Sequence, residues 1–251
     1  MKTSHCLLAA AVAVLFTGCQ QAAGPFLPDH DAIDVLIENG RVIDGSGAEP
    51  VSADVVIVGD TIVFVGDASF TDDDRNVRIA KTINADGRVV TPGFIDLHAH
   101  GDPLETPAME NFLAMGATTI ALGQDGSSPD VQPLSDWLAD VSATGIGTNL
   151  ALFVGHGTLR NQSGIGMSAG PEPEDMARML AMLDATLDYT FGLSTGLEYN
   201  PGLNADTAEL RALAKVVGAN DRLIMSHMRN EDDDQLESSI AELLEQGEDA
   251  R

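Results

Sequence analysis

Residues 89–100 read VVTPGFIDLHAH, an apolar run that ends in two histidines separated by one residue. Successive side chains of a β-strand point to opposite faces, so a strand through this run would direct His98 and His100 to the same side. Two imidazoles on one side of a strand end are suited to bind zinc or a related transition metal ion. An ordinary pair of surface or core histidines is the alternative, because histidine is often partly buried for structural reasons alone.

Downstream of His100, short apolar runs alternate with helix-like segments, which is typical of βα units with a parallel sheet. In the longest helix-like segment, Met176, Met179, Leu180 and Leu183 follow the i, i+3, i+4, i+7 spacing of one helix face. Strands are expected at 117–122, 149–154, 191–194 and 223–226. Helices are expected at 107–115, 131–141, 172–187, 206–217 and 235–244.

Residues 33–88 precede this alternation and are expected to form a small β module. Asn39-Gly40 and Gly59-Asp60 each suit a tight turn, so we predict a hairpin around each pair. A further short strand is expected at 82–85. The acidic run at 71–74 is expected to be a solvated loop.

Residues 1–19 combine an early lysine with an apolar run that is too short to span a bilayer, which is typical of a signal peptide. The run ends in LFTGC, which resembles a bacterial lipobox. This resemblance implies a lipidated Cys19 and an exported protein, periplasmic or anchored to a membrane as a lipoprotein. Plain secretion with cleavage nearby is the alternative. Residues 20–32 are interpreted as a tether.

Composition limits the function classes further. The chain has 251 residues, of which 44% are hydrophobic, enough for one large domain or two modest ones with a substantial core. Its net charge of −26 argues against a nucleic-acid partner, because phosphate binding needs clustered Lys and Arg. Both cysteines lie in residues 1–19, so the remainder has neither a disulfide framework nor a cysteine nucleophile or ligand.

Polar residues that follow the predicted strands form the candidate site, because catalytic groups of a (β/α)8 barrel sit at the C-terminal ends of its strands. Four of the six histidines, His98, His100, His156 and His227, follow such strands. Asp125 follows the strand at 117–122. It is interpreted either as a metal ligand or as a turn residue, because Asp-Gly is a good turn pair. The concentration of histidines indicates a metal site.

The phrase PGFIDLHAH resembles the first barrel strand of the amidohydrolase superfamily, metal-dependent hydrolases built on a (β/α)8 barrel. The phrases GHGTLR at 155–160, GLSTGLEY at 192–199 and SHMRNE at 226–231 are similar to the D-aminoacylase branch, the N-acyl-D-amino-acid deacylases. The similarity runs from about residue 33 to the end. It implies an α/β fold: a partial (β/α)8 barrel at 89–251, preceded by the N-terminal part of a small β-sandwich at 33–88.

The resemblance also implies the metal ligands. His98 and His100 match the first-strand ligands and His227 matches the fifth-strand ligand, with zinc, one or two ions, as the cofactor. Asp125 stands where many members of the family have a zinc-binding cysteine. A carboxylate is also a competent zinc ligand, although it is harder than a thiolate.

Four further residues have two interpretations each. By resemblance, His156 and Tyr199 are the candidate substrate-binding residues. The alternative for His156 is a residue that contacts the metal ligands and not the substrate. The alternative for Tyr199 is a core tyrosine. Arg229 and Glu231 either brace the site through hydrogen bonds or form a surface ion pair.

Residues 89–251 hold about five strand–helix units, whereas a closed barrel has eight in roughly 250 residues. We therefore expect the N-terminal part of a longer protein, with a complete smaller α/β domain as the alternative. No catalytic residue is assigned within this chain, because the resemblance places the general-base aspartate beyond Arg251. The 251 residues alone are expected to be inactive and unstable, since sheet edges and apolar faces would be exposed.

Together these features predict a zinc-dependent hydrolase of linear amides that releases a D-amino acid and a carboxylate from N-acyl-D-amino acids. The expected partner is a small-molecule substrate, with no nucleic acid and with membrane contact only through the lipid anchor. One alternative is another amidohydrolase that acts on cyclic amides or dipeptides. The other is a non-catalytic, lipid-anchored binding protein on a degenerate barrel.

Overall fold

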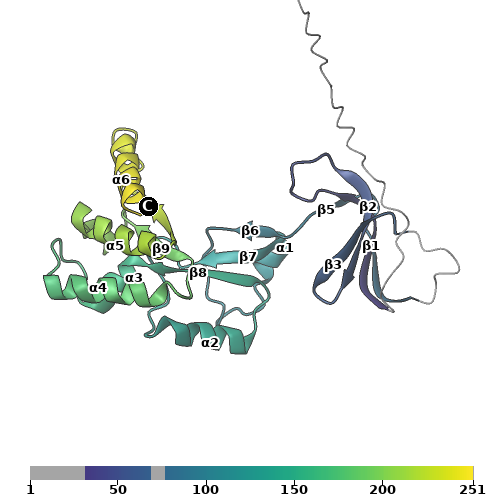
Figure 1. Cartoon of the computed structure of the whole chain (residues 1–251), viewed down its shortest axis with the longest axis horizontal. Coiled ribbons are helices and arrows are strands. Elements are labelled where there is room, and N and C mark those ends of the chain that lie inside the picture. Colours follow the sequence, from purple (N-terminus) through teal and green to yellow (C-terminus); the bar gives the residue numbers. More distant parts are fainter. Residues whose placement is uncertain (1–31, 69–76, 251) are drawn as a thin grey trace, which may run out of the picture. The chain divides into compact units, whose positions relative to one another are not determined.

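The computed structural model describes residues 32–68 and 77–250, which fall into two compact units divided between Pro92 and Gly93 (Figure 1). The predicted signal peptide at 1–19, the tether up to residue 31 and the acidic run at 71–74 lie outside the described residues. Each unit has its own sheet and its own core.

The first unit is a five-stranded sheet with the order β3-β2-β1-β4, in which β5 also pairs with β1. Its core includes Ile33, Leu36 and Val56. The predicted hairpin around Gly59-Asp60 is confirmed, because β2 and β3 pair antiparallel across it. The strands are β1 (Ala32–Val42), β2 (Val51–Val58), β3 (Thr61–Gly66), β4 (Arg78–Asn84) and β5 (Val89–Val90).

The predicted hairpin around Asn39-Gly40 is wrong. The chain continues through this pair as one strand, β1, and the pairing with β2 shifts register between Ile37 and Gly40. Asn39 has a φ of 57°, which suits a β-bulge as well as it suits a turn. The strand continues because β4 and β5 both pair with its other edge in parallel.

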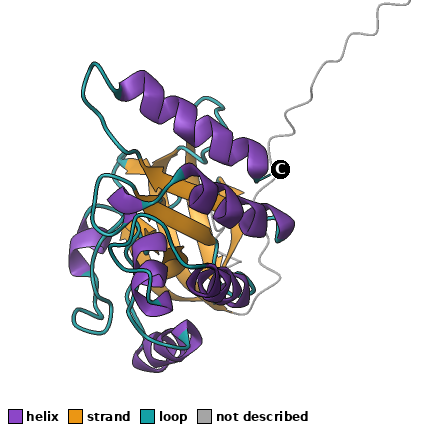
Figure 2. Cartoon of the chain, turned by 90° about the vertical axis from the view of Figure 1, so that its left-hand side faces the viewer, coloured by secondary structure: helices purple, strands orange, loops and turns teal. Residues whose placement is uncertain are grey.

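The second unit alternates strands and helices, as predicted. Its five strands are parallel and neighbour one another in chain order, β6 to β10, and Figure 2 shows the helices ranged around them. The strands are β6 (Phe94–Asp96), β7 (Ala117–Leu122), β8 (Asn149–Gly155), β9 (Gly192–Gly196) and β10 (Leu223–His227). The helices are α1 (Glu110–Ala114), α2 (Leu134–Thr144), α3 (His156–Ser163), α4 (Pro173–Thr186), the 3-10 turn η2 (Gly202–Asn204), α5 (Thr207–Ala219) and α6 (Leu236–Asp249).

The run at 89–100 is not one continuous strand. Val89 and Val90 pair with β1 in the first sheet, and the second sheet begins only with β6. Pro92, which has no N–H to donate to a ladder, separates the two pieces. The units therefore divide at Pro92, four residues after the boundary expected between residues 88 and 89. His98 and His100 lie just beyond β6 rather than within a strand.

Helix α3 was not expected from the sequence, because HGTLRNQS has no apolar periodicity. Its end does carry a signal: Gly164 caps it with a φ of 90°, the left-handed conformation that commonly follows a helix. The helix matters for the site, because it begins directly where β8 ends.

The core of the second unit lies between the sheet and its helices. Alternate residues of a strand face it, as Ile120 and Leu122 of β7 do, and they pack with Trp137 of α2 and Leu183 of α4. Within residues 32–68 and 77–250, none of the helices has both the length and the apolar character needed to cross a bilayer.

Gly123 ends β7 with a φ of +83°, and a Cβ there would lie 1.9 Å from the carbonyl oxygen of Phe153 on β8. We expect Gly123→Ala to lower the free energy of unfolding of the full-length protein by more than about 2 kcal/mol, since a strained φ and a backbone clash combine. Chemical denaturation measures this difference.

Gly164→Ala is the matched control. Gly164 also has a positive φ, but the nearest atoms to its Cβ would be 3.8 Å away. It should cost only about 1 kcal/mol, the penalty of the backbone conformation itself. Equal losses for the two variants would show that the close approach of β7 to β8 is not what Gly123 provides.

Candidate metal centre

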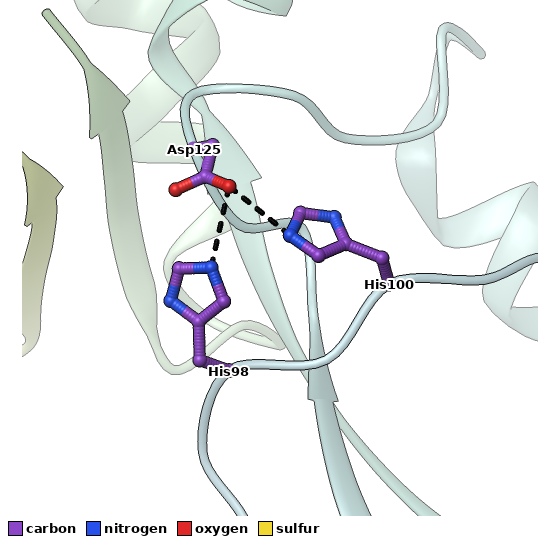
Figure 3. A group of neighbouring side chains, drawn as sticks. All are labelled: His98, His100 and Asp125. Atoms are coloured by element: carbon purple, nitrogen blue, oxygen red, sulfur yellow. Dashed lines mark hydrogen bonds and ion pairs between the residues drawn. The ribbon is translucent and has the colours of Figure 1, made fainter.

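Two neighbouring loops bring three polar side chains to one point. His98 and His100 lie on the loop after β6, Asp125 lies on the loop after β7, and Figure 3 shows both imidazoles directed at the carboxylate. Nε2 of His98 lies 3.2 Å and Nε2 of His100 lies 3.0 Å from Asp125 Oδ2. One ligand atom from each residue lies within 4.8 Å of the other two. The two histidines thus face one point, as the sequence predicted, although they follow the strand.

Hydrogen bonds hold these loops in place. The Asp96 carboxylate accepts the backbone N–H of His98 at 3.1 Å, and the amide of Gln124 donates to the carbonyl of Leu97 at 3.0 Å. The second bond ties the β7 loop to the β6 loop. Asp125 has a φ of 54°, a conformation that Asp tolerates better than most residues. Asp125 is therefore both a turn residue and a member of the cluster.

His227, the last residue of β10, completes the cluster from the other side. Its Nδ1 lies 3.5 Å from Asp125 Oδ1 and 3.4 Å from the hydroxyl of Tyr199. Its Nε2 lies 2.9 Å from Oε2 of Glu198. The other three predicted metal ligands therefore lie around the Asp125 carboxylate, at the C-terminal ends of the parallel strands.

The residues present fit a metal ion. Asp125 Oδ1 is a buried oxygen that accepts no hydrogen bond, although His227 Nδ1 lies 3.5 Å away. Leaving a buried carboxylate oxygen without a partner is costly, and a cation would satisfy it. Three imidazoles and one carboxylate are ordinary zinc donors. The assignment of these residues as ligands stays a prediction that this geometry supports.

Tyr199 lies beside His227 and is 45% exposed, so it is not a core tyrosine. The two ring centroids are 4.6 Å apart. Partial burial raises the pKa of the Tyr199 phenol above its ordinary value, and the negative charges of Asp125 and two nearby glutamates raise it further. The hydroxyl therefore keeps its proton at neutral pH and can donate a hydrogen bond.

His156 occupies a different environment, and direct substrate contact does not fit it. The residue is 0% exposed, and its Nε2 lies 2.7 Å from Oε1 of Glu209. Arg160, also 0% exposed, places NH1 at 2.6 Å and 2.7 Å from the two oxygens of the same carboxylate. His156 is thus part of a buried polar network, which agrees with a supporting role rather than with the substrate-binding role that we predicted.

Glu209 was missed by the sequence reasoning. Asp206 and Glu209 have the spacing of a helix capping pair, and Asp206 Oδ1 does accept the backbone N–H of Glu209 at 2.8 Å. That spacing suggests an exposed glutamate, yet Glu209 is 2% exposed. Arg160 could have indicated this residue. A buried arginine requires an acidic partner, and Glu209 is that partner.

Arg229 and Glu231 are not paired with each other. Arg229 binds the Glu242 carboxylate of α6 at 2.8 Å and the carbonyls of Leu203 and Ala205, so it braces the segments around the end of β10. Glu231 Oε1 lies 3.8 Å from His227 Nε2, beyond hydrogen-bond distance.

A cavity of about 290 Å³ opens next to the cluster. Asp125 and Tyr199 line it together with Asn161, Asn200 and the start of α3. This size is near the lower limit for a small-molecule site.

A parallel strand–helix sheet with histidines and a carboxylate gathered at its strand ends is the arrangement expected of part of a metal-binding (β/α)8 barrel. No family model matches the chain. It is 36% identical over 241 residues to an N-acyl-D-glutamate deacylase of Alcaligenes xylosoxydans xylosoxydans, a match that covers 87% of this chain and 48% of the relative.

Solved structures agree. An N-acyl-D-glutamate deacylase from Bordetella bronchiseptica, complexed with zinc and a phosphonate inhibitor, superposes with a TM-score of 0.79 at 31% identity, over 86% of this chain and 49% of that one. A D-aminoacylase superposes with a TM-score of 0.77 at 29% identity, over 87% and 50%.

The chain is therefore a homologue of the N-acyl-D-glutamate deacylases and D-aminoacylases, and its structural neighbours are amidohydrolases of the D-aminoacylase family. The predicted resemblance and the predicted fold, a partial (β/α)8 barrel with a separate β module, are confirmed. The chain spans about half the length of the curated relatives that it matches.

The buried network predicts that a conservative substitution of Glu209 strongly lowers the stability of the protein. Glu209→Gln would leave the Arg160 charge uncompensated in the interior, so we expect the free energy of unfolding to fall by about 3–5 kcal/mol. Glu174→Gln, an exposed change on α4, is the control and should stay within about 0.5 kcal/mol. Denaturant titration of the full-length variants measures both. Equal stability of the two variants would mean that the carboxylate is not needed.

Proposed function

We propose that the protein is a zinc-dependent deacylase of N-acyl-D-amino acids, which hydrolyses the linear amide to a D-amino acid and a carboxylate. The observation that supports this most directly is the meeting of His98, His100 and Asp125, with His227 3.5 Å from a buried oxygen of the same carboxylate that lacks a hydrogen-bond donor. The relatives support the substrate class, because they are named for N-acyl-D-glutamate and for D-amino acids.

We assign a separate role to each side chain of the site. His98 and His100 would hold the metal from the β6 loop, His227 from β10, and Asp125 from between them. Bound zinc supplies Lewis-acid polarisation of the scissile carbonyl and a lowered pKa for its water. The Tyr199 hydroxyl borders the same cavity and can orient a substrate oxygen by donating a hydrogen bond.

The test uses the full-length protein loaded with zinc and a panel of N-acetyl-D-amino acids, their L-enantiomers, dipeptides and hydantoins. We expect turnover of the D-enantiomers. His98→Ala should lower both zinc content and turnover by more than about 100-fold, since loss of a residue that merely supports a ligand already costs 10–100-fold. Lys215→Ala, exposed on α5, should change neither.

Three results would contradict the proposal. Zinc content unchanged by His98→Ala would remove the metal assignment. Turnover confined to hydantoins or dipeptides would favour another amidohydrolase activity. A zinc-free, inactive but folded protein would favour the non-catalytic binding protein.

We also propose that the protein is exported and anchored through a lipid on Cys19, which the signal-like residues 1–19 and their LFTGC ending support. Cells expressing the protein should incorporate labelled palmitate into it. Cys19→Ser should abolish the label, whereas Cys6→Ser, within the same apolar run, should keep it. A label that persists in Cys19→Ser, or is absent from the wild type, would overturn the anchor.

A further inference from the structure

The two ring nitrogens of His227 face different groups. Nε2 lies 2.9 Å from Oε2 of Glu198, which is hydrogen-bond distance. Nδ1 faces the cluster, at 3.5 Å from Asp125 Oδ1 and 3.4 Å from the Tyr199 hydroxyl. An ionised carboxylate only accepts, so Nε2 must carry the proton in its bond to Glu198. In the neutral ring, the lone pair is then on Nδ1, the nitrogen that faces the centre.

The backbone fixes Glu198 beside this ring. The N–H of Leu197 donates to the carbonyl of His227 at 3.0 Å, which joins the end of β9 to the end of β10. Glu198 therefore follows directly from a residue that is itself hydrogen-bonded to the His227 backbone. The Tyr199 ring, one residue further, packs on the imidazole at 4.6 Å and limits its rotation.

Glu198 differs from the other nearby acid, Glu231. The Glu231 carboxylate lies 3.8 Å from the same Nε2, is 59% exposed, and is too distant for a hydrogen bond. Glu198 is 49% exposed, so substituting it removes little packing. Two carboxylates, those of Glu198 and Glu231, thus lie near the His227 imidazole. Only Glu198 is close enough to fix the tautomer of His227.

We propose that Glu198 is a positioning residue, which holds the proton of His227 on Nε2 and thereby presents Nδ1 to the metal. This inference rests on the proposed metal-dependent function. A carboxylate behind a metal-binding histidine fixes the tautomer and the ring orientation and makes the imidazole a stronger donor. Glu198 makes no contact with the cluster except through His227 in the described part of the chain, so its effect reaches the metal through that ring.

The test measures zinc affinity and tautomer separately, with chelator competition and ¹⁵N-histidine NMR on the full-length protein. Glu198→Leu should weaken zinc binding about 10–100-fold, and the metal-free protein should show a mixture of His227 tautomers. Glu198→Gln keeps an accepting oxygen, so it should retain the Nε2–H tautomer and lose less than about 10-fold in affinity. Glu231→Leu, the matched control, should leave both readouts unchanged.

The outcomes separate this inference from the proposed activity. Wild-type zinc affinity and a pure Nε2–H tautomer in Glu198→Leu would overturn the role of Glu198, whatever the activity. An equal loss of affinity in Glu231→Leu would also overturn it, because general negative charge would then explain the effect. If the wild type binds zinc but hydrolyses no N-acyl-D-amino acid, the proposed function fails while the tautomer result stands. A wild type that binds no zinc overturns both.

Discussion

The Asp125 carboxylate is the contact on which the candidate metal centre depends. Oδ2 faces the two histidines of the β6 loop, and Oδ1 faces His227 at the end of β10. These groups come from the first, second and fifth strands of one parallel sheet. The carboxylate therefore contacts residues from the first and the last strand of the sheet. The pairing of the strands between them sets the distance between the β6 loop and His227. A change in strand register would move His227 away from Asp125 even if every side chain were kept.

The buried network of His156, Arg160 and Glu209 lies on the elements that follow β8 and β9. It links α3, which begins where β8 ends, to the first turn of α5, which follows the Tyr199 segment. The Arg160 guanidinium also donates to the Gly166 carbonyl at 3.0 Å, so the same side chain holds the loop after α3. A charged pair in an interior is costly unless hydrogen bonds compensate it, and here α3, α5 and the loop after α3 supply the partners of Arg160 and Glu209.

The sequence predicted the parts of the fold that depend on periodicity and on strand ends. The strand at 117–122 was predicted with its observed bounds. Asking which polar residues follow strands selected His98, His100, Asp125 and His227, which lie near one another in the structure. The same question applied to β9 would have found Glu198, two residues beyond its last residue. The prediction that failed, the hairpin around Asn39-Gly40, depended on strand pairing that is distant in the sequence. Asn39-Gly40 has the local chemistry of a turn, and only strands 40–50 residues away decide that the chain continues straight.

An aspartate at position 125, where the resemblance leads one to expect a cysteine, changes what the centre can hold. A thiolate offers one sulfur, whereas this carboxylate offers two oxygens that already face different histidines. One oxygen toward the β6 loop and one toward His227 suit either a single ion bound between them or two ions bridged by the carboxylate. Oxygen is also a harder donor than sulfur, so the preference for zinc over harder divalent ions should be weaker here than at a cysteine site. If Asp125 binds the metal as proposed, this one residue influences both the identity and the number of the ions, and His227, held by Glu198, would add a nitrogen donor on the Oδ1 side of the carboxylate.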